Sequence, residues 1–222
     1  MSGRELVIVD YGVGNLRNVY KAVEAAGGQA RVVNRPEALR EAAAIILPGV
    51  GAFGDAAANL RAAGFEGPLR EAVAEGKPLL GICVGMQLLF DESDENVAHL
   101  AMDAHPGLGL IPGRVTRFAP DMVGADGKPL KVPAIGWNQL AHDGSDPLLK
   151  GIAGGAYAYF VHSYYCRPDD PHAVAASTEY GIEYCSVVRR ENLWGIQCHP
   201  EKSQQVGLAI LRNFVELANE WA

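Results

Sequence analysis

The sequence predicts an α/β fold in which a mostly parallel sheet carries helices on both faces. In the first half of the chain, short apolar runs alternate with segments of helical periodicity, which is typical of such sheets. In the second half, strand-like segments follow one another with turn signals and no helix between them, which indicates a mixed or antiparallel extension. Because no linker or repeat interrupts the 222 residues, we expect a single domain spanning residues 1–222.

The elements of the first half follow from its apolar patterning. Leu6–Val9 is a continuous apolar run, as expected for a strand buried on both faces. From Leu16 to Val23 the apolar residues recur at helical spacing, and Gly27-Gly28 ends that helix. Later strands are predicted at Ala30–Val33, 44–47 and 78–82, and helices at 53–63 and 86–90.

The second half is predicted to contain strands separated by turns. These strands lie at 115–118, 135–140, 156–165, 173–177, Glu183–Arg190 and 193–198. Segment 119–131 is rich in Gly, Pro and Asp and is interpreted as an exposed loop. An amphipathic stripe over 206–221 predicts a final helix, with Ser203 as its N-cap.

Charge and cysteine content narrow the function classes. The 26 acidic and 19 basic residues give a net charge of −7, which disfavours binding to nucleic acids or anionic membranes. No apolar stretch is long enough for a transmembrane helix, and no secretory signal is evident, so we expect a cytoplasmic protein. The cysteines lack CxxC or other metal-ligand spacing, so reduced thiols and no metal site are expected.

The strongest local signal is Gly81-Ile82-Cys83-Val84-Gly85, which follows an apolar strand. Small residues two before and two after Cys83 permit a sharp strand-to-helix turn that exposes the nucleophile. Backbone N–H groups at the start of the following helix would face a developing oxyanion. The alternative interpretation is a buried structural cysteine between two packing glycines.

A second signal follows the last predicted strand. In an extended segment, His199 and Glu201 point the same way, so Glu201 can orient His199 while His199 takes the proton of Cys83. The alternative is a surface histidine and a helix-capping glutamate. Both signals lie at carboxyl ends of predicted strands, where parallel sheets place their active sites, and together they favour a nucleophile–base pair.

Two glycine-containing turns differ in what they predict. At 48–51, Gly49 and Gly51 let the backbone approach a ligand, although a plain strand-to-helix turn explains them equally well. Segment 12–15 sits where a dinucleotide fingerprint would, but Arg17 replaces its third glycine and no acid ends the second strand. We therefore expect no nucleotide cofactor.

Several motifs resemble those of a known family. Segments 48–51, 81–87 and 197–203 are similar to the class I (triad) glutamine amidotransferases. Segments 10–16, 136–138 and 160–165 resemble one branch of that family, the glutaminase subunits of imidazole glycerol phosphate synthase, nearly end to end. This resemblance implies a flavodoxin-like fold and hydrolysis of L-glutamine to glutamate and ammonia, without cofactors. It also implies a heterodimer with a (β/α)8-barrel cyclase that uses the ammonia in histidine biosynthesis.

The resemblance also implies roles for individual residues. Cys83 would form a glutamyl thioester, His199 would be the general base and acid, and Glu201 would orient His199. Val84 and the turn at Val50 and Gly51 would supply the oxyanion hole. The residues implied to bind glutamine are Gly49, Gln87, Glu95, Ser163 and Tyr164.

One departure and one regulatory expectation accompany the resemblance. Ala134 stands where the family usually has His, which puts the local contacts of that strand in doubt but leaves the triad intact. Because the family is nearly idle without its partner, we hypothesise that the Val50 peptide flips, which Gly51 makes inexpensive.

Three rival functions stay open at this point. The chain can be a glutaminase that serves another pathway, such as pyridoxal phosphate synthesis. It can be a γ-glutamyl peptidase that is active in isolation. It can also be a flavodoxin-like regulatory module with a redox-sensing Cys83, although the His-Pro-Glu segment argues against a sensor.

Overall fold

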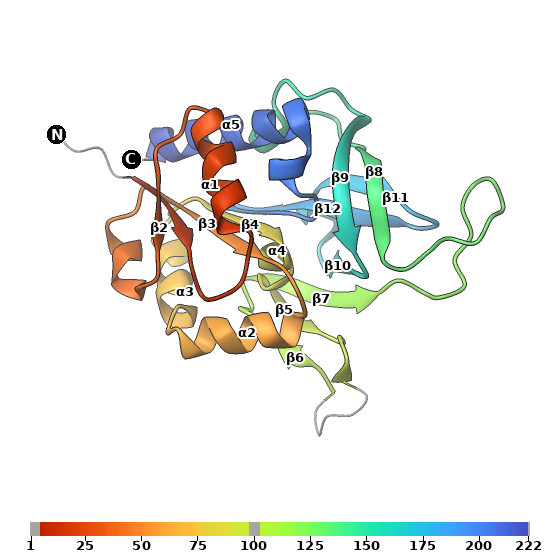
Figure 1. Ribbon diagram of the computed structural model, residues 1–222, viewed down its shortest axis with the longest axis horizontal. Coiled ribbons are helices and arrows are strands. Elements are labelled where there is room, and N and C mark those ends of the chain that lie inside the picture. The colour runs from red at the N-terminus through yellow and green to blue at the C-terminus, as the bar shows by residue number, and fades with distance from the viewer. Residues whose placement is uncertain (1–4, 98–102, 222) are drawn as a thin grey trace.

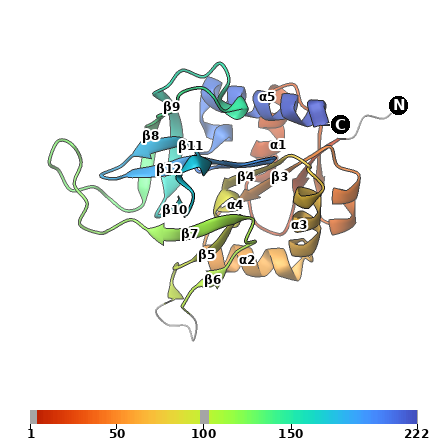
Figure 2. The ribbon, with the colours of Figure 1, turned by 180° about the vertical axis from the view of Figure 1, so that it is seen from behind.

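The computed structural model describes residues 5–97 and 103–221 and has three layers. A central sheet separates α1 and α5 on one face from α2 and α3 on the other (Figure 1; Figure 2 gives the view from behind). This arrangement confirms the predicted α/β class. Within the described residues, no helix has both the length and the apolar character needed to cross a membrane.

The parallel part of the sheet confirms the predictions for the first half of the chain. Its spatial order is β2-β1-β3-β4-β13, and all neighbouring pairs are parallel. Every residue of β1, β3, β4 and β13 is buried, which explains why these strands read as apolar runs. The strands are β1 (Leu6–Val9), β2 (Ala30–Val33), β3 (Ala44–Gly49), β4 (Leu79–Cys83) and β13 (Leu193–Ile196).

The extension beyond β13 is mixed, as predicted. The order continues β12-β10-β7-β5-β6, with β11 paired to β12, and every contact here is antiparallel except β5 with β7. The strands are β5 (Phe90–Ser93), β6 (His105–Pro106), β7 (Ile111–Arg117), β10 (Tyr164–Pro168), β11 (Val174–Glu179) and β12 (Glu183–Arg190).

The predicted strand at 156–165 is in fact two strands that belong to different sheets. β9 (Ala156–His162) pairs with β8 (Ala134–Leu140) in a separate two-stranded sheet, whereas β10 joins the main sheet. Ser163 lies between them, and its carbonyl accepts a hydrogen bond from the Phe118 N–H. The continuous run of aromatic residues hides this change of sheet in the sequence.

The helices agree with prediction except in two places. The helix predicted at 86–90 is only one turn, α4, because Phe90 already begins β5. Helix α3 has no counterpart in the sequence prediction, since it buries only Leu69 and Ala72. The helices are α1 (Leu16–Ala25), α2 (Phe53–Ala62), α3 (Glu66–Ala74), α4 (Val84–Gln87) and α5 (Gln204–Trp221).

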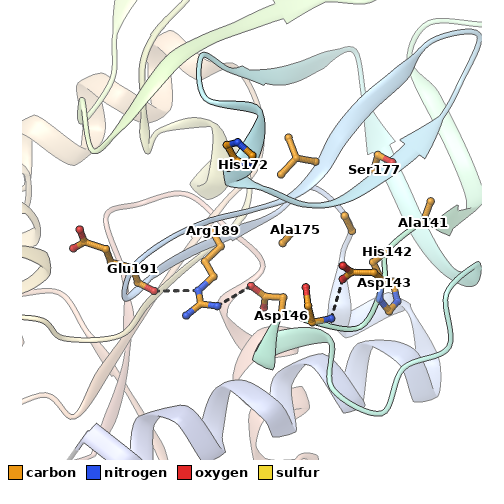
Figure 3. Close-up of a pocket in the computed structure, with 12 residues that line it drawn as sticks. Ala141, His142, Asp143, Asp146, His172, Ala175, Ser177, Arg189 and Glu191 are labelled. Atoms are coloured by element: carbon orange, nitrogen blue, oxygen red, sulfur yellow. Dashed lines mark hydrogen bonds and ion pairs between the residues drawn. The ribbon is translucent and has the colours of Figure 1, made fainter.

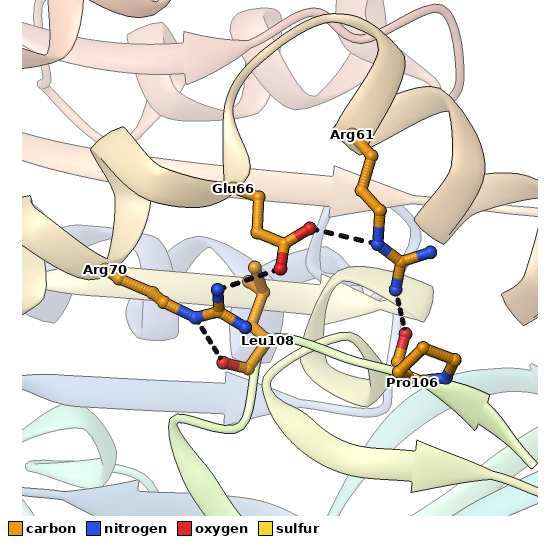
Figure 4. A network of polar contacts seen from close by, with 5 residues as sticks. All are labelled: Arg61, Glu66, Arg70, Pro106 and Leu108. Carbon is orange, nitrogen blue, oxygen red and sulfur yellow. Dashed lines mark hydrogen bonds and ion pairs between the residues drawn. The ribbon is translucent and has the colours of Figure 1, made fainter.

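A polar network ties α2 and α3 to the chain around β6 (Figure 4). Glu66 pairs with Arg61 at 2.9 Å and with Arg70 at 2.8 Å. The same arginines donate to the carbonyls of Pro106 and Leu108, respectively. The network therefore holds segment 106–108 in place, and the Leu108 N–H also donates to the Leu88 carbonyl just after α4.

Candidate active site

The predicted site residues meet because three neighbouring strands end together. β3, β4 and β13 are adjacent and parallel, so their carboxyl ends share one edge of the sheet. Gly49 and Cys83 are register partners at the ends of β3 and β4. The segment after β13 brings His199 to the same edge.

Cys83 occupies a sharp turn between β4 and α4. Its backbone has φ 55° and ψ −113°, a conformation that non-glycine residues rarely adopt. A Cβ on Gly81 would lie 2.6 Å from the Gly85 carbonyl oxygen, and one on Gly85 would lie 1.8 Å from the Leu47 carbonyl oxygen. The flanking glycines are thus required by close backbone packing, as the elbow pattern predicts.

His199 lies between Cys83 and Glu201 in the way that a general base requires. Its Nδ1 is 3.0 Å from Oε1 of Glu201, whose side chain is almost fully buried. Burial alone lowers the pKa of His199, but its hydrogen bonds and charge interactions with Cys83 and Glu201 outweigh burial and raise the pKa to about 9. The arrangement therefore favours an imidazolium facing Cys83 at neutral pH.

The second oxygen of Glu201, Oε2, is buried without a hydrogen-bond partner among the described residues. The carboxylate therefore has His199 as its one hydrogen-bonding partner in this part of the molecule. Behind the pair, Ser203 donates to the His199 carbonyl at 2.7 Å and accepts from the Tyr159 N–H at 2.9 Å. Ser203 directly precedes α5, but its hydroxyl braces His199 and makes no capping bond to the helix.

A cavity of about 320 Å³ opens in front of the triad. It is large enough for an amino acid, and most of its lining comes from the turn after β3, from β4 and α4, from β9 and β10, and from the segment after β13. Two predicted residues lie outside its lining: Gly49 packs against Gly85, and Glu201 lies behind His199. The lining residues are Val50, Gly51, Cys83, Val84, Gln87, Glu95, Pro133, Val161, His162, Ser163, Tyr164, His199 and Lys202.

The turn that follows β3 contributes Val50 and Gly51 to the same cavity lining as Cys83. Gly51 has φ 88°, and a Cβ there would meet no atom within 4 Å, so only its backbone conformation demands glycine. Tyr11, a residue to which the sequence analysis gave no role, donates its hydroxyl to the Pro48 carbonyl at 2.8 Å and so anchors the turn. Its place in segment 10–16 was the one available signal.

Comparisons with known proteins identify a family to which this chain belongs. Residues 7–217 match the family model described as glutamine amidotransferase class-I. The imidazole glycerol phosphate synthase subunit HisH of Syntrophotalea carbinolica is 49% identical over 96% of this chain and 100% of its own length. The chain belongs to the class-I glutamine amidotransferases and, among them, to the HisH family. HisH of Halobacterium salinarum is 48% identical over 96% of this chain and 94% of its own.

Solved structures support the same fold for the amidotransferase. A crystal structure titled glutamine amidotransferase is 25% identical, covers 96% of this chain and 98% of its own, and superposes with a TM-score of 0.70. The PurLQS structure from Thermotoga maritima is 18% identical, with a TM-score of 0.71 over 97% of this chain and 99% of its own. At that identity, the second likeness concerns the fold alone.

Gln87 and Glu95 of the amidotransferase both line the cavity, but their hydrogen-bond capacities differ. Gln87 is buried and donates to the carbonyl of Tyr164 at 3.3 Å and to Oε1 of Gln197 at 3.1 Å. Glu95 accepts the N–H of Phe53, at the start of α2, at 2.6 Å. Burial raises the pKa of Glu95, partly offset by that hydrogen bond.

Ser163 and Tyr164 reach the cavity because the chain changes sheets there. The carbonyl of Tyr164 also accepts a hydrogen bond from Nδ1 of His162 at 2.8 Å, which leaves Nε2 of His162 to accept from the Tyr184 hydroxyl at 3.1 Å. Burial lowers the pKa of His162 to about 4, so this ring stays neutral. His162 is a buried residue whose two ring nitrogens both have hydrogen-bond partners, and it also lines the cavity.

A second and larger cavity, about 470 Å³, lies away from the triad, between segment 141–146 and strands β11 and β12 (Figure 3). Two of its charged groups, Arg189 and Asp146, already pair with one another. Arg189 lies 3.6 Å from Asp146 and donates to the Glu191 carbonyl. Asp146 also accepts from Trp194 at 3.2 Å. None of the predicted site residues lines this cavity, and no group of metal-binding side chains occurs among the described residues.

Proposed function

We propose that the chain hydrolyses L-glutamine to glutamate and ammonia through a thioester on Cys83, and delivers the ammonia to a separate cyclase. The observation that carries this proposal is the alignment of Cys83, His199 and Glu201 beside an amino-acid-sized cavity. Membership of the HisH family favours imidazole glycerol phosphate synthesis, and hence histidine biosynthesis, as the use of the ammonia. No cofactor is needed for this chemistry.

The raised pKa of His199 suits this residue to accept the proton of Cys83. His199 takes up that proton as the sulfur attacks the carboxamide carbon, and Glu201 stabilises the charged ring that results. The C–N bond then breaks, and His199 donates its proton to the departing ammonia. His199, now neutral, removes a proton from water, which attacks the thioester and releases glutamate. Glu201 holds the ring throughout and stabilises its charged form.

The negative oxygen formed in each step needs backbone donors. The N–H of Val84, the first residue after the elbow, is one candidate, and an N–H of the turn at Val50 and Gly51 is the other. The positive φ of Gly51 lets this peptide exist in two orientations at small cost. Partner binding would favour the orientation that points its N–H into the cavity.

The charges of the α-ammonium and α-carboxylate groups of glutamine indicate which residues bind each of them. Glu95 and the side-chain oxygen of Gln87 are acceptors, so they suit the α-ammonium group of the substrate. Ser163 and Tyr164 line the same cavity and are proposed to hold the α-carboxylate. Gly49 acts indirectly, because its packing on Gly85 places the oxyanion turn beside the nucleophile.

The proposed partner is a (β/α)8-barrel cyclase that docks over the mouth of the cavity. The outer face of the β8–β9 sheet carries three exposed apolar side chains, Ile135, Trp137 and Tyr157, with 63, 46 and 55% of their surface accessible. Ile135 is the register partner of Val161, which lines the cavity, so this face adjoins the active site. Such a patch favours a protein interface over solvent exposure.

The net charge of −7 makes nucleic acids and anionic membranes unfavourable partners. The four cysteines are free and buried. That state suits the reducing cytoplasm, which we propose as the compartment.

The first experiment measures glutamate release from glutamine by the chain alone and together with a cognate cyclase and its ribotide ligand. A Cys83→Ala protein runs in parallel. Low activity alone, a large rise with the partner and loss in the variant would support the proposal. Full activity of the chain without its partner would favour an uncoupled glutaminase or γ-glutamyl hydrolase. No activity in any mixture would mean that the turn around Cys83 has only a structural role.

A further inference from the structure

Two buried amide side chains connect the nucleophile to the wall of the substrate cavity. Gln197 follows β13, is fully buried, and donates from Nε2 to the sulfur of Cys83 over 3.7 Å. Its Oε1 accepts from Nε2 of Gln87, which also donates to the carbonyl of Tyr164. Gln87 itself lines the cavity, whereas Gln197 does not.

The backbone carbonyl of Tyr164 fixes the direction of every hydrogen bond in this series of side chains. The backbone carbonyl of Tyr164 has no proton, so the Gln87 group that faces it must be the NH₂ group. The second proton of that NH₂ group goes to Gln197, which must therefore present its oxygen. The NH₂ group of Gln197 is then left facing Cys83. Reversing either amide would set two acceptors or two donors against each other.

The orientation of the Gln87 amide determines which of its groups can bind a ligand in the cavity. Both N–H groups of Gln87 are used inside the protein, so the group that remains for a ligand is its Oε1, an acceptor. In glutamine, the donors are the carboxamide nitrogen and the α-ammonium group. The carboxamide nitrogen must lie near Cys83 and His199 to leave as ammonia, so the α-ammonium group is the donor available to Gln87.

The geometry points to Gln197 as a positioning residue that fixes the Gln87 amide for selection of α-amino substrates and orients the Cys83 sulfur for attack. This inference rests on the proposed glutaminase function. Neither the elbow nor the His199–Glu201 pair requires an amide at position 197, and a fully buried side chain that only filled space would be apolar.

Replacement of Gln197 by methionine removes both hydrogen bonds while keeping a similar volume. The assay measures ammonia release, with the cyclase and its ligand present, from L-glutamine and from its deamino analogue glutaramate. We expect the ratio of kcat/KM for glutamine over glutaramate to fall about tenfold or more, as for a lost hydrogen bond to a charged group. We also expect kcat for glutamine to fall, because the sulfur loses its donor.

The variant Gln197→Glu separates the two roles. A carboxylate oxygen still accepts from Gln87, so the glutamine/glutaramate ratio should stay within about twofold of wild type. The carboxylate cannot donate to Cys83, so kcat should fall about 10- to 100-fold with little change in KM. Gln29→Glu, in an exposed loop, makes the same chemical change away from the site and should behave as wild type.

The inference is overturned if Gln197→Met lowers activity toward both substrates equally, which is the signature of general loosening. It is also overturned if Gln197→Glu loses selectivity, or if it retains the wild-type kcat. Thermal unfolding of each variant identifies one that fails to fold, and the remaining variant then decides. If wild type releases no ammonia from glutamine, the proposed function fails instead, so the two failures are distinguishable.

Discussion

Replacing Glu201 by glutamine tests how much the orienting carboxylate contributes to catalysis. The change is nearly isosteric, and an amide oxygen can still accept from Nδ1 of His199, so the hydrogen bond survives while the charge disappears. The amide NH₂ would then occupy the place of Oε2, which already lacks a partner, so no existing hydrogen bond is broken there. The substitution therefore isolates charge from geometry.

The magnitude follows from the pKa of His199. A rise from the ordinary value of 6.5 to about 9 corresponds to about 3 kcal/mol in favour of the imidazolium, and Cys83 and Glu201 share this stabilisation against the opposing effect of burial. Loss of roughly half of this stabilisation predicts that kcat falls about tenfold in Glu201→Gln.

The proposed role of His199 also fixes the direction in which activity changes with pH. His199 must be protonated to donate to the leaving ammonia, so activity is present below its pKa and is lost as pH rises through it. Because Glu201 raises that pKa, the variant should lose activity at lower pH than wild type, whose alkaline limb is expected near 9. Glutamate release from pH 6 to 10, with cyclase and ligand present, measures both effects.

The matched control is Glu216→Gln, an exposed glutamate of α5, which changes the net charge by the same amount. It should leave the rate and the alkaline limb unchanged. A Glu201→Gln protein with the wild-type rate and the wild-type limb would refute the assignment of Glu201 as the residue that stabilises the imidazolium.

Three further predictions concern the backbone and the docking face. Gly51→Val should abolish stimulation by the partner, whereas Gly151→Val, at an equally open glycine with φ 75°, should not; stimulation assays compare them. Gly85→Ala should lower the thermal midpoint sharply or prevent folding, because its Cβ would lie 1.8 Å from the Leu47 carbonyl oxygen; a wild-type melting curve would contradict this. Trp137→Ala should weaken cyclase binding in titration calorimetry by at least tenfold with an unchanged midpoint, and equal affinity would exclude this face as the interface.

The sequence predicts best those elements whose patterning is dictated locally. β1 and β2 have the predicted boundaries, since each is a short run of strand-forming residues closed by turns. Helix α3 escapes prediction because a glycine and a proline lie in its first turn and few apolar residues mark its buried face. The division of 156–165 into β9 and β10 depends on pairing. β9 pairs with the preceding strand, β8, whereas β10 pairs with β7, which is separated from it in the sequence by both β8 and β9.

The same distinction applies to the active site. That Cys83, His199 and Glu201 meet can be predicted because each lies in a short motif at a strand end. Gln197 is adjacent in sequence to one of these motifs, yet its role depends on Cys83 and Gln87, which are 114 and 110 residues away. Its contribution becomes visible only when β4 and β13 are placed side by side.

The glycines at the strand ends link packing to the proposed catalysis. A Cβ on Gly49 would lie 2.6 Å from the Gly85 nitrogen, so the end of β3 and the start of α4 are in direct backbone contact. That contact holds the turn at Val50 and Gly51 beside Cys83, and a side chain inserted there would separate them. We therefore expect a substitution at Gly49 to disturb both the packing and the proposed oxyanion donor, whereas Gly51, with open space around it, allows the turn to be varied without a packing clash.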